Sequence, residues 1–242
     1  MEPVFRSRGI RVLLDGGKIS LQEKVYYEPN ENCRIENKEV TGLMSRGLIS
    51  LFEYAVIDGE IDTYNFHVNL TDNNFAEIFT GLPEEITAEF AGIRDCFGSS
   101  IQNYTLGYRL DGPEIVSRSY YFYPTVWRGT RYGIKGITHK ETILHNLAKF
   151  SERIAQGNEK LKAEINDFAS ILYKFKGISV HVSEQVDGYK LYGRAKGEEL
   201  RQLLLENCGY DTDAIPGHGE AVLAALRIDK TTVKGYNIYY LT

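Results

Sequence analysis

Hydrophobic and polar residues alternate along several stretches of this chain, which is the pattern of strands that bury one face. Within residues 61–70, for example, Phe66 and Val68 alternate with polar neighbours. Most of these stretches come in pairs joined by a short turn such as Asp187-Gly188, so we expect β-hairpins. The predicted strands are 9–15 with 19–27, 61–70, 103–111 with 115–126, 178–185 with 189–195, and 221–229 with 232–241.

Between the strands, hydrophobic residues recur every three or four positions, as in helices that bury one side. Pro83 suits the first turn of one helix, Thr138 and Glu141 form a capping-box pattern, and Gly209 suits a helix end. The element order is ββα, βα, ββαα, ββα, ββ without a Ser/Pro-rich linker, so we expect one domain over residues 1–242. The predicted helices are 41–56, 83–97, 138–154, 161–175 and 197–208.

The two faces of the predicted strands differ in polarity. One face collects polar side chains with an unusual share of tyrosine, and the other collects residues such as Val12, Phe66 and Leu191. Repeated antiparallel hairpins with helices on one side favour a closed sheet. We therefore predict an α+β fold, an antiparallel β-barrel of about ten strands built from repeated ββα units with an outer ring of helices. The alternative is an open two-layer sheet whose polar face contacts solvent.

A basic residue precedes a tyrosine by two positions in the second arm of four predicted hairpins. Residues i and i+2 of a strand share a face, so each pair directs a cation and a phenol the same way. For 28 Lys+Arg and 17 Tyr in 242 residues, chance gives roughly two such pairs. A barrel interior lined in this way suits an anionic leaving group and a carbocation. The pairs are Lys24/Tyr26, Arg118/Tyr120, Lys190/Tyr192 and Lys234/Tyr236.

Composition narrows the class of protein. A net charge of −5 argues against a general nucleic-acid binder, and no apolar run approaches the ~20 residues that span a bilayer. The N-terminus lacks the order of a secretory signal. Cys33, Cys96 and Cys208 are odd in number and far apart, which indicates a reducing compartment rather than a disulfide framework or a zinc site. We expect a cytoplasmic monomer without a nucleic-acid or membrane partner.

Three stretches of the chain carry a family resemblance. They are Cys33–Glu36 with Ser45-Arg46 and the expected apolar helix Leu48–Glu53, then Leu106–Asp111 with Arg118-Ser119-Tyr120, and then Phe168–Ser170 leading into residues 178–194. In pattern and order they resemble the ABBA aromatic prenyltransferases, most closely the cyanobactin-type peptide prenyltransferases. The chain is shorter than typical members. Gln22 follows Ser20-Leu21 where the family has a Ser-Leu-Glu stretch, with Glu23 one place later.

The resemblance implies a prenyltransferase that moves a dimethylallyl or longer isoprenyl group from its diphosphate to an aromatic or hydroxyl side chain of a peptide or small aromatic acceptor. Because the chain has no D-D-x-x-D motif, Mg²⁺ would be carried mainly by the diphosphate. Glu23 or Asp15 would act as the base, Glu23 by its nearness to the family position and Asp15 by sharing the strand face of Arg11. The diphosphate would be bound by Lys24, Arg46, Arg118, Lys190, Lys234 and Arg194, with Arg227 next. The allyl cation would be shielded by Tyr26, Tyr120, Tyr192 and Tyr236.

Each candidate also has a simpler interpretation. A strand Lys or Arg is most often a solvated surface charge, Asp15 suits a turn, and His67 and His181 suit a polar wall better than catalysis. The basic loop 128–135 could close over a diphosphate or be a solvated turn, and residues 216–219 only superficially resemble a phosphate loop. Two other functions stay open, a non-catalytic barrel that binds an anionic or hydrophobic ligand, and an interaction module that uses its curved sheet and residues 128–140.

Overall fold

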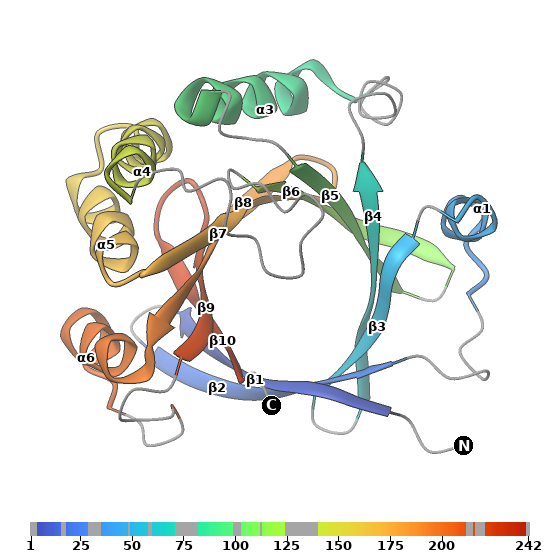
Figure 1. Ribbon diagram of the computed structural model, residues 1–242, viewed down its shortest axis with the longest axis horizontal. Helices are drawn as coiled ribbons and strands as arrows, with labels where there is room; N and C mark the ends of the chain where they lie inside the picture. Colours follow the sequence, from blue (N-terminus) through green and yellow to red (C-terminus); the bar gives the residue numbers. More distant parts are fainter. Residues whose placement is uncertain are drawn as a thin grey trace.

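A single antiparallel sheet closes into a barrel. The computed structural model describes residues 4–15, 18–28, 35–47, 49–57, 60–70, 82–98, 103–111, 113–123, 140–211, 215 and 221–240. Strands adjacent in sequence are neighbours in the sheet, and β1 (Val4–Asp15) also pairs with β10 (Val233–Tyr240), which closes the ring (Figure 1). The other strands are β2 (Lys18–Glu28), β3 (Ile49–Ile57), β4 (Glu60–Leu70), β5 (Asn103–Asp111), β6 (Glu114–Tyr123), β7 (Lys174–Val182), β8 (Val186–Lys196) and β9 (Ala221–Ile228).

The helices lie outside the ring of strands (Figure 1). In the described residues, β1–β2, β3–β4, β5–β6 and β7–β8 are each followed by one or two helices, and β9–β10 completes the sheet. The predicted α+β class, the curled antiparallel sheet and the outer helices are therefore confirmed, and the open-sheet alternative does not hold. The helices are α1 (Lys38–Ser45), α3 (Glu84–Phe97), α4 (Lys140–Ala155), α5 (Glu159–Ser170) and α6 (Gly197–Cys208).

Two predicted helices are wrong in part. Residues 41–56 were expected to be one helix, but α1 ends at Ser45, Gly47 has a φ of +67°, and residues 49–57 form β3. An apolar run of this length fits either a buried helix or a strand, and pairing with β2 and β4 selects the strand. In the same way, the predicted helix 161–175 ends at Ser170, and its last two residues begin β7.

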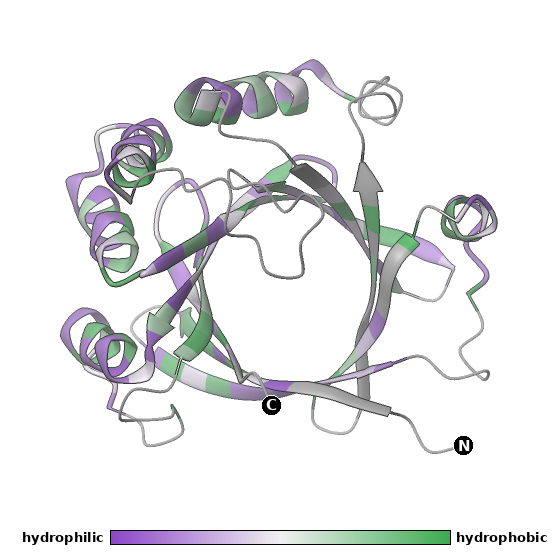
Figure 2. Ribbon diagram, viewed as in Figure 1, coloured by the Kyte–Doolittle hydropathy of each residue, from purple (hydrophilic) through white to green (hydrophobic). Residues whose placement is uncertain are grey.

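The hydrophobic core lies between the outer wall of the barrel and the helices. The predicted buried stripe of α3, which includes Phe90, is at most 4% exposed. The Phe90 ring lies 4.8 Å from that of Tyr120 on β6, and the Phe168 ring of α5 lies 6.2 Å from that of Tyr236 on β10. Figure 2 shows both polar and apolar stretches on each helix, as expected for elements with one buried side. The barrel interior is therefore separate from this core.

The seam between β1 and β10 depends on a glycine. Gly235 lies opposite Leu13 at a β-bulge of β10 and has a φ of +136°, a region that residues with a side chain rarely adopt. A Cβ atom on Gly235 would lie 1.9 Å from the carbonyl oxygen of Val12. A side chain at this position would therefore push the first and last strands apart.

We predict that Gly235→Ala lowers the free energy of unfolding by about 2 kcal/mol or more, because backbone strain and the clash with Val12 add together. Chemical denaturation measures the change. The control is Gly42→Ala in α1, where an added Cβ meets no atom within 4 Å. That variant should be neutral or more stable by up to about 1 kcal/mol. Equal stability of the two variants would contradict this account of the seam.

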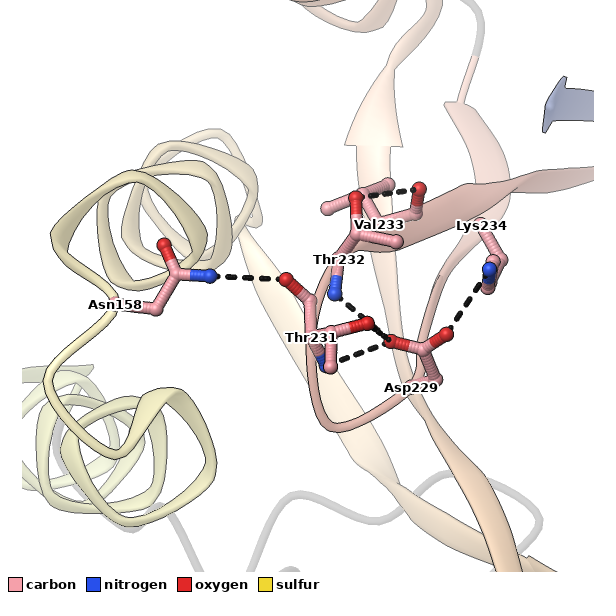
Figure 3. Close-up of polar contacts among 6 residues, drawn as sticks. All are labelled: Asn158, Asp229, Thr231, Thr232, Val233 and Lys234. Carbon is pink, nitrogen blue, oxygen red and sulfur yellow. Dashed lines mark hydrogen bonds and ion pairs between the residues drawn. The ribbon is translucent and has the colours of Figure 1, made fainter. Parts of the chain in front are cut away.

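A carboxylate organises the turn between β9 and β10 (Figure 3). Asp229 Oδ1 accepts hydrogen bonds from the backbone N–H and hydroxyl of Thr231 at 2.7 and 2.8 Å and from the N–H of Thr232 at 2.8 Å. Its Oδ2 lies 3.0 Å from Nζ of Lys234. Asn158, which caps α5, donates from Nδ2 to the Thr231 carbonyl at 2.9 Å, so the turn is also tied to the helices.

Partial burial raises the pKa of the Asp229 carboxyl, but the hydrogen bonds from Thr231, Lys234 and Thr232 outweigh it and lower the pKa to about 2. A lowered carboxyl pKa adds stability that is complete above the ordinary value and is lost as the pH falls toward the folded value. The turn is therefore stabilised through the neutral range.

We predict that Asp229→Ala lowers the free energy of unfolding at pH 7 by about 1–3 kcal/mol, because several hydrogen bonds to a charged group are lost. The difference from wild type should shrink as the pH falls from 4 toward 2. Asp187→Ala is the matched control, since that carboxylate lies in an exposed turn and accepts from the Ser183 hydroxyl. It should change stability by less than about 0.5 kcal/mol. A pH-independent effect of Asp229→Ala would contradict the role of the charge.

Candidate functional site

Cations from five strands face the barrel interior. Lys190 on β8 lies opposite Arg227 on β9. Lys24 on β2 and Arg109 on β5 also act electrostatically on Lys190, although β2 and β5 are not neighbours of β8 in the sheet. These charges therefore act on one another across the interior. We call this set the cation cluster; its members are Arg11, Lys24, Arg109, Lys190 and Arg227.

The cation cluster is electrostatically unfavourable in the free protein. The pKa of Lys190 is lowered well below its ordinary value, first by burial and then by the other four cations. Burial and the charge of Arg11 also lower the pKa of Arg227. Arg11 Nε and Arg227 Nη1 are buried without a hydrogen-bond partner. Buried donors of this kind are costly unless an acceptor satisfies them, so the arrangement suits a bound anion.

Tyrosines line the same interior beside the cations. The Tyr26 and Tyr239 ring centroids are 5.8 Å apart, and Tyr121 lies 6.3 Å from Tyr123 and 5.9 Å from Tyr192. Burial raises the pKa of Tyr26, Tyr121, Tyr123 and Tyr192, so these phenols are uncharged at neutral pH. The interior therefore offers aromatic ring faces and neutral hydroxyl donors next to positive charge.

An imidazole joins several hydroxyl groups on one side of the interior. His181 Nδ1 lies 2.8 Å from Ser119 Oγ, and its Nε2 lies 3.1 Å from Ser179 Oγ. Ser179 Oγ lies 3.1 Å from the Tyr192 hydroxyl. We call Ser119, His181, Ser179 and Tyr192 the hydroxyl–imidazole line. Burial, followed by the charges of Lys190 and Arg227, lowers the pKa of His181 well below its ordinary value, so the imidazole is neutral.

The interior differs from the outer core in solvent exposure. Lys190, Tyr192 and Arg227 are only half-buried although strands surround them. Tyr189 and Tyr236, which face outward on the same strands or their neighbours, are 2% and 1% exposed. Lys190, Tyr192 and Arg227 thus keep some surface accessible to a small molecule or to water, whereas Lys24, Tyr26 and Ser179 are at most 7% exposed.

The structure places six of the residues predicted to form the site on the interior face, namely Lys24, Tyr26, Lys190, Tyr192, Arg194 and Arg227. Lys24 and Tyr26 of β2 face Lys190 and Tyr192 of β8 across the interior, and Lys24 Nζ lies 5.6 Å from the centroid of the Tyr26 ring. Arg194 follows Tyr192 by two positions on the same face of β8, and its Nε is buried without a hydrogen-bond partner.

The predicted interior positions of the other two basic-x-tyrosine pairs are wrong. Arg118 Nη2 lies 3.1 Å from Glu39 Oε2 of α1, and Tyr120 packs on α3 as described above. Tyr236 packs on α5, and Lys234 is half exposed beside Asp229. Because side chains alternate along a strand, a shift of one residue decides the face, and the pairs on β6 and β10 have the outward register.

The remaining predicted residues also lie away from the cation cluster. Arg46 is exposed at the end of α1. Glu23 faces outward with its side chain 63% exposed, 3.9 Å from Arg8 Nε. Asp15 is exposed at the turn end of β1, which agrees with its interpretation as a turn residue. The two expected bases are therefore not positioned as predicted. Glu53 of β3 is an acid that does act on the interior, since it raises the pKa of Tyr26.

Several interior residues were missed for identifiable reasons. Glu53 lies within the apolar run 41–56, whose spacing predicts a helix and therefore assigns it no strand face. Tyr121 and Tyr123 share the face of Ser119 on β6, which is the face opposite to that of Tyr120. The basic-x-tyrosine pattern points to Tyr120 and therefore to the wrong face. Tyr239 and Arg11 meet Tyr26 and Lys190 only because the first and last strands pair.

Some predictions fall on residues that the structure does not describe, namely the loops 128–135 and 216–219, Cys33, Thr138 and the side chain of His67. Within the described ranges, no group of three or more His, Cys, Asp or Glu side chains is arranged to hold a metal ion. None of the helices described here combines the length and apolar character needed to cross a membrane.

Comparison with known protein families finds no match, and comparison with curated proteins finds no relative either.

We predict that Lys190→Met raises the free energy of unfolding at pH 7 by about 1 kcal/mol, because it removes a half-buried cation that other cations repel. Since the folded pKa of Lys190 is lowered, the gain should disappear as the pH rises toward the ordinary value of 10.5. Denaturation at several pH values measures this. The exposed Lys149 of α4 provides a control, and Lys149→Met should change stability by less than about 0.5 kcal/mol. A destabilised Lys190→Met protein would show that the ammonium is well paired.

Proposed function

We propose that this protein is a prenyltransferase of the ABBA barrel type, which moves a dimethylallyl or longer isoprenyl group from its diphosphate to an aromatic or hydroxyl side chain. The acceptor would belong to a peptide or a small aromatic molecule. The observation that carries the proposal is the cation cluster, which has unsatisfied guanidinium donors and lies beside tyrosine rings inside a closed barrel. The chemistry of an allylic diphosphate needs both features in one place.

The cation cluster would stabilise the leaving group. As the bond between the isoprenyl carbon and the diphosphate oxygen breaks, negative charge grows on the diphosphate. Arg11, Lys190 and Arg227 are held in place by strands and need little rearrangement to meet this charge. Fixed donors of this kind typically contribute about 100-fold to 1000-fold each in rate. Mg²⁺ would arrive with the diphosphate, since anion-binding side chains rather than carboxylate ligands dominate the cluster.

The tyrosines would stabilise and shield the allylic cation that forms when the bond to the diphosphate breaks. An allylic cation is attracted to the face of an aromatic ring, by about 2 kcal/mol when both are shielded from solvent. Tyr26, Tyr121 and Tyr192 have ring faces in the interior beside the cations. A wall that keeps bulk water away would also prevent loss of the cation as a prenyl alcohol.

The alternative is a barrel that binds an anionic or hydrophobic ligand without reaction. Glu23 and Asp15, the two expected bases, are exposed and do not lie beside the cation cluster. Because a binding barrel needs no base, their positions favour this alternative. Both functions require the anion site, and only one requires transfer. Detection of a prenylated product, rather than a binding measurement, therefore distinguishes the two functions.

We predict that the protein, mixed with dimethylallyl diphosphate, Mg²⁺ and peptides that contain Tyr, Trp, Ser or Thr, adds an isoprenoid unit that mass spectrometry detects. Lys190→Ala and Arg227→Ala should each lower turnover by about 100-fold or more. Lys234→Ala removes an exposed cation of the same sequence pattern outside the interior, and it should change turnover by no more than about twofold.

Two outcomes would contradict the proposal in different ways. If pyrophosphate binds in calorimetry but no acceptor is modified with donors of several chain lengths, the protein is the binding barrel. If pyrophosphate does not bind, the interpretation of the cation cluster itself is wrong.

A further inference from the structure

The hydroxyl–imidazole line has the composition of a proton path. Both ring nitrogens of His181 contact hydroxyl oxygens, at 2.8 Å for Ser119 and 3.1 Å for Ser179. A neutral imidazole has one N–H and one lone pair, so it donates to one serine and accepts from the other. The Tyr192 hydroxyl extends the line at 3.1 Å from Ser179. Tyr121 also forms hydrogen bonds with Tyr192 and Ser119, so the line is connected at both ends.

The line lies directly beside the cation cluster. Ser179 is opposite Lys190 in the β7–β8 register, and Lys190 is opposite Arg227 in the β8–β9 register. Tyr192 follows Lys190 by two positions and shares its face. An anion held by Lys190 and Arg227 would therefore be close to the hydroxyl groups of the line.

We propose that His181 is the proton acceptor of the transfer reaction, reached through the hydroxyl groups of Ser179 and Tyr192, and that an anion on the cation cluster makes it a stronger base. This inference rests on the proposed function. It names a group for the one step that Glu23 and Asp15 do not fill, the removal of a proton from the acceptor.

The bond between the isoprenyl carbon and the diphosphate oxygen breaks, and its electron pair leaves with the diphosphate. The acceptor atom forms a bond to that carbon and loses its proton. The proton passes through the hydroxyls of Tyr192 and Ser179 to Nε2 of His181, which accepts from Ser179 when Nδ1–H donates to Ser119, and the ring becomes an imidazolium. Release of pyrophosphate then lets His181 return the proton to solvent.

Charge explains why base strength would depend on the anion. In the free protein, burial and then the charges of Lys190 and Arg227 disfavour the imidazolium. A bound diphosphate places negative charge beside both cations and offsets their effect. Linkage requires the reverse as well, so that a protonated His181 binds the anion more tightly. The base would thus be effective only when the donor is present.

The neighbouring groups allow His181 to be followed separately. The phenols that face it, Tyr121 on β6 and Tyr192 on β8, have raised pKa values and stay neutral between pH 5 and 8. Lys190 and Arg227, which face it from β8 and β9, have lowered pKa values, and a bound anion would raise the pKa of Lys190 as well as that of His181. A measurement of total proton uptake would mix the two residues, so the imidazole itself must be observed.

The decisive experiment is an NMR titration of the full chain with labelled histidine, with and without saturating inorganic pyrophosphate. His181→Gln assigns the His181 resonance among the five histidines. We expect the protonation midpoint of His181 to rise by about one pH unit or more when pyrophosphate binds, as for a group that gains an opposite charge nearby. The resonance of His145, which is exposed on α4, is the control and should show no change that depends on pyrophosphate.

The outcomes separate this inference from the proposed function. An unchanged His181 midpoint with pyrophosphate bound would overturn the inference and leave the anion site intact. Absence of pyrophosphate binding would overturn both. If pyrophosphate binds and shifts the His181 midpoint but no acceptor is prenylated, His181 is not the base of a transfer reaction. The coupling between anion binding and protonation would then be a property of a binding barrel.

Kinetics test the role in turnover. His181→Gln keeps an amide donor and acceptor but cannot titrate. It should lower kcat by about 100-fold or more, leave KM for the diphosphate nearly unchanged, and remove the acidic limb of the pH profile. His145→Gln should match wild type. A large loss in Glu53→Gln together with normal turnover in His181→Gln would assign the proton to Glu53 and overturn the inference.

Discussion

The antiparallel pairing of β1 with β10 is the contact on which the rest of the structure depends. It joins the two ends of the described chain and turns a row of hairpins into a closed wall. Arg11 on β1, which only β10 separates from β9, then acts electrostatically on Lys190 and Arg227. With the seam open, Arg11 would be solvated apart from Lys190 and Arg227, which would stay neighbours on β8 and β9. Gly235 allows the two backbones to approach closely enough for that pairing.

Closure of the sheet also gives its two faces different roles, stability on the outer face and binding on the inner face. The apolar residues of the strands and helices meet outside the ring, and burial there supplies the main stabilising free energy. The inner side holds polar and charged groups whose burial is unfavourable without a ligand. The stability of the outer core therefore permits an interior that is arranged for binding rather than for packing, which is a common relation between stability and function.

The same short pattern has two different outcomes in this barrel. Lys24/Tyr26 and Lys190/Tyr192 face inward, whereas Arg118/Tyr120 faces the helices. The two orientations differ by a shift of one residue along the strand, and the side chains find partners in both. Tyr120 supplies an aromatic ring to the core, and the neighbouring Tyr121 takes the inward position beside Tyr192. A pattern within one strand thus shows that two side chains share a face but not which face it is.

Local sequence determined the hairpins, most helices and the presence of one polar face, because alternation, caps and turn residues act over a few positions. It also contained Lys24, Tyr26, Lys190, Tyr192, Arg194 and Arg227 as candidates for one site. It did not determine that residues 49–57 form β3, since an apolar run fits either element until strand partners are available. Nor did it determine which side of each strand faces inward, or that Ser119 and His181, 62 residues apart, share a hydrogen bond. Those features arise from pairing between distant strands, and only the closed sheet fixes them.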